Sequence, residues 1–138
     1  MPAKLTLSDV EREFKIAMPR LEARVRNAYL DYLAEQSHPS AEIERFKKLK
    51  NAPAGIKRAI LRMLKQRRAA VHKLICKDLN YCARIEAQST KFALEFANAI
   101  VTGKIALLTA LPIPAVKIAV YVVRTRLLDP FCECKQSS

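Results

Sequence analysis

Residues 105–123 read IALLTALPIPAVKIAVYVV and carry a single charge, at Lys117. Their mean hydropathy is roughly +2 per residue, which is in the range of transmembrane helices. Pro112-Ile113-Pro114 interrupts this apolar run. Because proline cannot continue a helix, the pattern predicts two helical pieces about a kink.

Two structures are compatible with the apolar run. In the first, residues 92–123 form a spanning helix or a hairpin that is embedded in a membrane or pressed against it. In the second, the run is the central hairpin of a soluble bundle, wrapped by the amphipathic helices before it. Lys117 would cost a few kcal/mol at the bilayer midplane unless it found a partner. We favour the membrane alternative. The residues of this membrane or core segment are Ile105, Leu107, Leu108, Leu111, Ile113, Val116, Ile118, Val120, Val122 and Val123.

The rest of the chain predicts an all-α fold. Only two glycines occur in 138 residues, too few for the tight turns of a β-rich fold. We expect a small bundle of four to six helices, with a long central helical segment and a C-terminal Pro-kinked apolar helix or hairpin. The expected segments are an amphipathic helix over 1–38, a basic helical segment over 39–91, the apolar segment over 92–128 and a tail over 129–138.

Local signals refine the first two segments. The Ser8-x-x-Glu11 pattern has the form of a capping box at the start of the first helix. Pro19 lies inside the apolar stripe of that helix and must kink it or split it near Met18. In the central segment an apolar stripe continues from Val71 to Ile100. The weak pattern at residues 66–68 fits either a break between two helices or an exposed stretch of one long helix.

The strongest functional signal is a basic block at residues 45–77, which holds twelve Lys and Arg and no acid. Spacing places Arg58, Arg62, Lys65 and Arg68 on one helical face together with His72. Like charges on one face repel, so an anionic partner would relieve the repulsion. The side chains expected to bind that partner are Lys47, Lys48, Lys50, Lys57, Arg58, Arg62, Lys65, Arg67, Arg68 and Lys73.

Three kinds of partner fit the basic block, beside a plain solvated face. Anionic lipid head groups favour a juxtamembrane basic cluster, and the neighbouring apolar run supports this choice. Nucleic acid phosphates would give salt-dependent, sequence-blind binding. An acidic protein is the third. No aromatic residue lies between Phe46 and Tyr81, which argues against a single-strand reader that stacks bases.

The four cysteines, Cys76, Cys82, Cys132 and Cys134, do not have the spacing of a zinc site or of a small disulfide scaffold. We expect free thiols, a frayed tail, no metal and no cofactor. Residues 1–14 lack the apolar core of a signal peptide, so an intracellular location is expected. No motif of an enzyme is present.

The sequence therefore predicts a non-enzymatic, basic, membrane-associated accessory or effector protein. The alternative is a cytoplasmic, soluble helical bundle that binds nucleic acid or an acidic protein through its basic face. A subunit of a larger assembly, docking through the stripe from Val71 to Ile100, is a further possibility.

Overall fold

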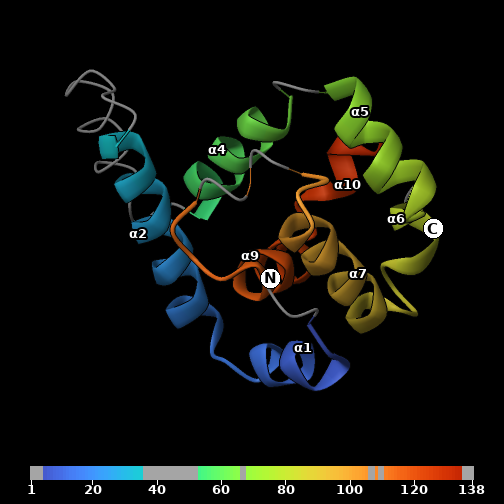
Figure 1. Ribbon diagram of the computed structural model, residues 1–138, viewed down its shortest axis with the longest axis horizontal. Helices are drawn as coiled ribbons and strands as arrows, with labels where there is room; N and C mark the ends of the chain where they lie inside the picture. The colour runs from blue at the N-terminus through green and yellow to red at the C-terminus, as the bar shows by residue number, and fades with distance from the viewer. Residues whose placement is uncertain (1–4, 36–52, 66–67, 106–107, 109–110, 135–138) are drawn as a thin grey trace.

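The computed structural model describes residues 5–35, 53–65, 68–105, 108 and 111–134, with no strand among them (Figure 1). The all-α prediction is confirmed, with more helices than the four to six expected. The elements are α1 (Leu7–Phe14), α2 (Met18–Glu35), α4 (Pro53–Lys65), α5 (Arg68–His72), the π-helix η1 (Lys73–Asp78), α6 (Tyr81–Arg84), α7 (Ser89–Val101), α9 (Ala115–Thr125) and α10 (Leu128–Phe131).

Helix α9 lies at the centre of the bundle. It packs most extensively against α7 and also contacts α1 and α2. Figure 1 shows α7 and α9 in the middle of the view, with α2 on one side, α1 below and α4, α5 and α10 above. The chain therefore wraps its earlier helices around its C-terminal apolar part.

The burial of α9 explains why the sequence of this helix is so apolar. Every residue from Ile118 to Val123 is at most 4% exposed. A helix that is apolar on all sides is typical of a deep core as well as of a membrane span. In the part of the chain that the structure describes, no helix is both long enough and apolar enough to cross a membrane.

The N-terminal region forms two helices, and the predicted split near Met18 is confirmed. Helix α1 ends at Phe14 and α2 begins at Met18, with Pro19 in its first turn. Proline is tolerated there because the first helical N–H groups have no partner within the helix. The predicted capping box at Ser8 is wrong, because Ser8 lies inside α1.

The capping box is formed two residues earlier, by Thr6 and Asp9. The Thr6 side chain accepts from the Asp9 N–H, and the Thr6 N–H donates to the Asp9 carboxylate at 2.8 Å. This hydrogen bond, followed by one from the Thr6 hydroxyl, lowers the pKa of Asp9 below its usual value of 3.8. An Asp at the third helical position replaces the Glu that the usual pattern requires.

Helix α1 is attached to the core by polar contacts. The Leu5 N–H donates to Oδ1 of Asn98 in α7 at 2.9 Å, and Nδ2 of Asn98 donates back to the Leu5 carbonyl at 3.4 Å. At the other end, the Arg124 guanidinium of α9 donates to the carbonyl of Ile16. These contacts fix the N-terminal arm across α7 and α9.

The central segment is not one long helix. After α5 the chain passes into η1, then turns at Asn80, whose φ of 54° lies in the left-handed region that asparagine tolerates. The stripe expected to be a docking surface faces inward instead: Val71, Ile75, Ile85, Phe92, Phe96 and Ile100 are all buried in the core of this chain. These six residues therefore pack within the chain and are not available to a docking partner.

Candidate functional site: a basic face on α4 and η1

Helix α4 separates apolar and basic residues on its two sides. Ile60, Met63 and Leu64 are buried, whereas Arg58, Arg62 and Lys65 are exposed. The hydrophobic side anchors the helix in the bundle, so the three cations are held in water rather than paired inside. This is the amphipathic arrangement that the sequence pattern predicts.

The exposed cations of α4, Arg58, Arg62 and Lys65, form no ion pair with the acids that the structure describes.

The π-helix η1 adds two more cations. Lys73 and Lys77 are exposed, and Ile75 between them is buried. We define the basic face as the five described and exposed cations of α4 and η1: Arg58, Arg62, Lys65, Lys73 and Lys77. Figure 1 shows α4 and α5, which leads into η1, as neighbours along the upper edge of the molecule.

The other predicted binding residues divide into two groups. Lys47, Lys48, Lys50 and Arg67 lie outside the described residues. Lys57 lies on α4 and Arg68 begins α5, but the structure describes only the backbone of these two residues and not their side chains. His72 was expected beside the arginines. It is half-buried, and its ring lies 5.5 Å from that of Phe131, so it does not belong to the basic face.

The predicted membrane or core segment supplies the centre of the core. Buried members are Ile105, Leu108, Leu111, Val116, Ile118, Val120, Val122 and Val123; Ile113 is half-buried, and Leu107 lies outside the described residues. The second of the two predicted helical pieces is α9, which begins directly after Pro114. Most of the first piece lies outside the described residues, and Leu108 within it is helical.

Lys117 has the partner that an apolar surrounding requires. Its Nζ donates to both carboxylate oxygens of Glu13 in α1, at 2.9 and 3.1 Å. Each side chain is only 13% exposed. The single charge of the apolar run is thus neutralised by a residue more than a hundred positions away, which no local pattern could indicate.

One buried polar atom of α9 lacks a hydrogen bond. Among the buried side-chain oxygen and nitrogen atoms of the described residues, the Tyr121 hydroxyl is the one that has no hydrogen-bond partner. Burial, and then the charge of Glu22, raises the pKa of Tyr121 above its usual value. A neutral phenol with no partner destabilises the core.

The four cysteines form two disulfides, so the expectation of free thiols is wrong. Cys76 is bonded to Cys132 and Cys82 to Cys134, with Cα–Cα distances of 5.4 and 5.3 Å. The two pairs are 56 and 52 positions apart in sequence, so spacing alone gave no sign of the pairing. Cys76 and Cys82 do lie on different local elements, and each reaches a different tail cysteine.

The tail is held in place as well, contrary to the frayed end expected. Residues 127–134 carry α10, whose Leu128 and Phe131 are buried. The buried Tyr81 hydroxyl donates to the Asp129 carboxylate, and Arg126 pairs with the same carboxylate at 2.9 Å. Burial, followed by the hydrogen bond to Asp129, raises the pKa of Tyr81 well above its usual range. Residues 135–138 lie outside the described residues.

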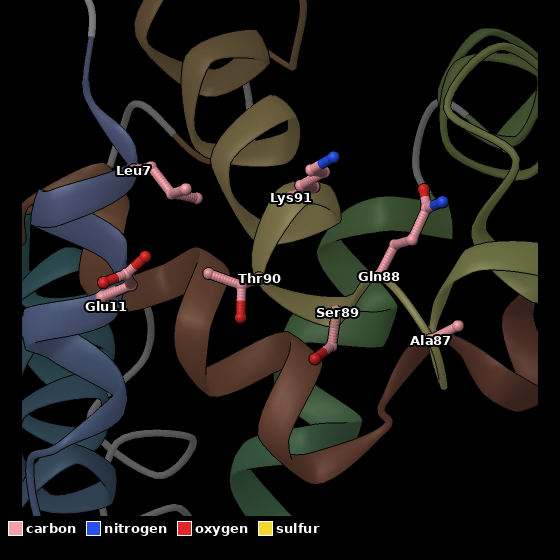
Figure 2. A pocket seen from close by; sticks show the side chains of 7 residues that line it. All are labelled: Leu7, Glu11, Ala87, Gln88, Ser89, Thr90 and Lys91. Atoms are coloured by element: carbon pink, nitrogen blue, oxygen red, sulfur yellow. The ribbon is translucent and has the colours of Figure 1, made fainter.

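A surface pocket of about 410 Å³ lies between α1 and the start of α7 (Figure 2). Leu7 and Glu11 form one wall, and Ser89, Thr90 and Lys91 contribute to the other. Figure 2 shows Leu7 directed toward α7 and the Lys91 amine turned outward.

Comparisons with known proteins do not assign a family. No protein-family model, curated protein or solved structure matches this chain. Within the described residues there is also no group of three or more His, Cys, Asp or Glu side chains that could hold a metal ion. The basic face is the candidate site that the chain's own residues provide.

Proposed function

We propose that this protein is a non-enzymatic, disulfide-braced helical protein that associates peripherally with an anionic membrane surface through its basic face. The observation that carries the proposal is the outer side of α4, where Arg58, Arg62 and Lys65 are exposed and unpaired within the described residues. In this proposal the apolar run is the core of the protein and not its anchor.

The energetic argument rests on charge. A basic residue near an anionic leaflet contributes about 1 kcal/mol, and the contribution disappears as salt screens it. The whole chain carries a net charge of +12, so the long-range field also attracts it to such a surface. Peripheral binding needs no insertion, which agrees with the deep burial of α9.

The disulfides argue against nucleic acid as the partner, and they require that the anionic membrane surface faces an oxidising compartment. Disulfides persist in oxidising compartments and are rare in the cytosol and nucleus, where most nucleic acid is found. For the same reason we place the protein in an oxidising compartment, in place of the intracellular, reducing one that the sequence suggested. The lack of base-stacking aromatics along residues 47–80 points the same way.

The test is co-sedimentation of the full oxidised chain with phosphatidylcholine vesicles that contain phosphatidylserine. We expect binding that falls steeply as salt rises, and no binding to pure phosphatidylcholine. Reversing three charges, as Arg58→Glu, Arg62→Glu and Lys65→Glu, is expected to weaken binding by at least about a hundredfold, since each charge is worth about 1 kcal/mol.

A matched control reverses three other exposed cations, Lys15, Arg20 and Arg24, in the same way. This control has the same net charge, so equal loss in both variants would mean that only total charge matters and would contradict a defined face. Retention of the protein in vesicles after carbonate extraction would restore the anchoring alternative. Binding to duplex DNA but not to vesicles would replace the proposal with the nucleic-acid alternative.

A further inference from the structure

The two disulfides join the same two short segments of the chain. Cys76 and Cys82 are six positions apart, and Cys132 and Cys134 are two positions apart. Each bridge alone closes a loop of more than fifty residues between these segments. Once one bridge is closed, the other closes only a small ring. Cutting either bridge therefore leaves the two segments joined.

The segment held by this pair of bridges is irregular and carries part of the basic face. Cys76 lies within η1, between Lys73 and Lys77. A π-helix is rare, and η1 ends at Asp78, two residues before Asn80, whose backbone lies in the left-handed region. The covalent links thus hold an irregular element that exposes two of the five cations.

Noncovalent contacts also join the two segments: Leu128 and Phe131 are buried in the core, and the Phe131 ring lies 5.5 Å from that of His72. Tyr81 donates to Asp129, and Arg126 approaches Glu86 at 3.7 Å, a pair that is half-exposed or more. Exposed ion pairs contribute little to stability. The central helix α9 packs against both α7 and α2, and these contacts do not involve η1.

We propose that residues 127–134 act as a redox-sensitive double latch on η1, which opens only when both disulfides are reduced. The reductant is a thiol of the glutathione or dithiothreitol class. Each bridge accepts two electrons and two protons from two thiol groups, gives two cysteine thiols, and leaves the reductant as a disulfide. Cys82 is exposed whereas Cys76 is half-buried, so the Cys82–Cys134 bridge is reduced first.

Opening the latch has a defined consequence for the basic face. In the closed form Lys73 and Lys77 are held in place together with the cations of α4. In the open form η1 must be ordered again on binding, and that ordering lowers affinity. The proposal rests on the proposed function for its binding readout, but the state of the latch is measurable without any partner.

The experiment treats the full oxidised chain with graded dithiothreitol, then alkylates it and counts the modified cysteines by intact mass. Hydrogen exchange in η1 and α6 is followed in parallel. We expect the species with one bridge cut to retain protection, and the species with both cut to lose it there while α7 and α9 stay protected. Loss of protection after the first cut, retention after the second, or unfolding of the whole bundle would each overturn the latch.

A second experiment measures binding to the phosphatidylserine-containing vesicles for the oxidised, singly reduced and fully reduced chains. Full reduction is expected to weaken binding by about tenfold, within what two cations near the surface contribute. The control is Lys73→Ala with Lys77→Ala, which should bind about as weakly when oxidised and should not respond to reduction. The hydrogen exchange could follow the prediction while the oxidised chain fails to bind vesicles. That result would refute the proposed function but would still support the latch.

Discussion

Helices α9 and α4 use the same basic residue types in opposite ways. In α9, Lys117 is 13% exposed and is neutralised by Glu13 of α1. In α4, Arg58, Arg62 and Lys65 are exposed and have no ion-pair partner among the described residues. The buried charge serves the fold because it ties two distant helices together. The exposed charges have no such role among the described residues, and we propose that they serve binding instead.

The largest expected effect on stability comes from breaking the buried ion pair between Glu13 and Lys117. Glu13→Leu leaves Lys117 without a counter-charge inside the bundle, and should lower the free energy of unfolding by about 3 kcal/mol. The double variant Glu13→Leu with Lys117→Met removes both charges and should recover most of that loss. Urea unfolding followed by far-UV circular dichroism measures both. An equal loss in the two variants would mean that packing, and not the unpaired charge, sets the cost.

A smaller effect tests the unpartnered hydroxyl of the same helix. Tyr121→Phe removes a buried oxygen that has no hydrogen bond, and should raise the free energy of unfolding by about 1 kcal/mol. The control is Tyr81→Phe, which breaks the hydrogen bond to Asp129 and should lower it by about the same amount. Destabilisation by Tyr121→Phe in the same urea assay would show that its hydroxyl has a partner after all.

The smallest effect belongs to the exposed side. The triple variant Arg58→Ala, Arg62→Ala and Lys65→Ala should change the free energy of unfolding by less than about 0.5 kcal/mol, since exposed side chains rarely contribute more. Leu64→Ala on the buried side of α4 is the contrast, with an expected loss of about 3 kcal/mol. A large loss in the triple variant would mean that these cations stabilise the fold, and would weaken their assignment to a partner.

Sequence reasoning succeeded where the signal was local and periodic. The all-α class, the split near Met18 and the amphipathic character of α4 all follow from apolar spacing and from proline. It failed at the capping box, where Thr6 and Asp9 replace the better-known pattern at Ser8 and Glu11. It also failed to detect η1, because a π-helix has no composition that distinguishes it from an α-helix.

The largest errors concerned pairings over long distances. The disulfides join residues more than fifty positions apart, and the Glu13–Lys117 pair spans more than a hundred. The apolar run illustrates the same limit. Its hydropathy is equally suited to a bilayer and to a bundle centre, so hydropathy could not choose between them.

What the sequence determined by itself is that this chain forms helices, that one part of it must leave water and that another part must stay in it. Helix periodicity and net composition set these features because they depend on residues within a few turns. Only the tertiary structure decided that α9 leaves water by entering the protein's own core, which cysteines are joined and which lysine is neutralised. Those outcomes depend on which distant segments meet, and that depends on the packing of the whole bundle.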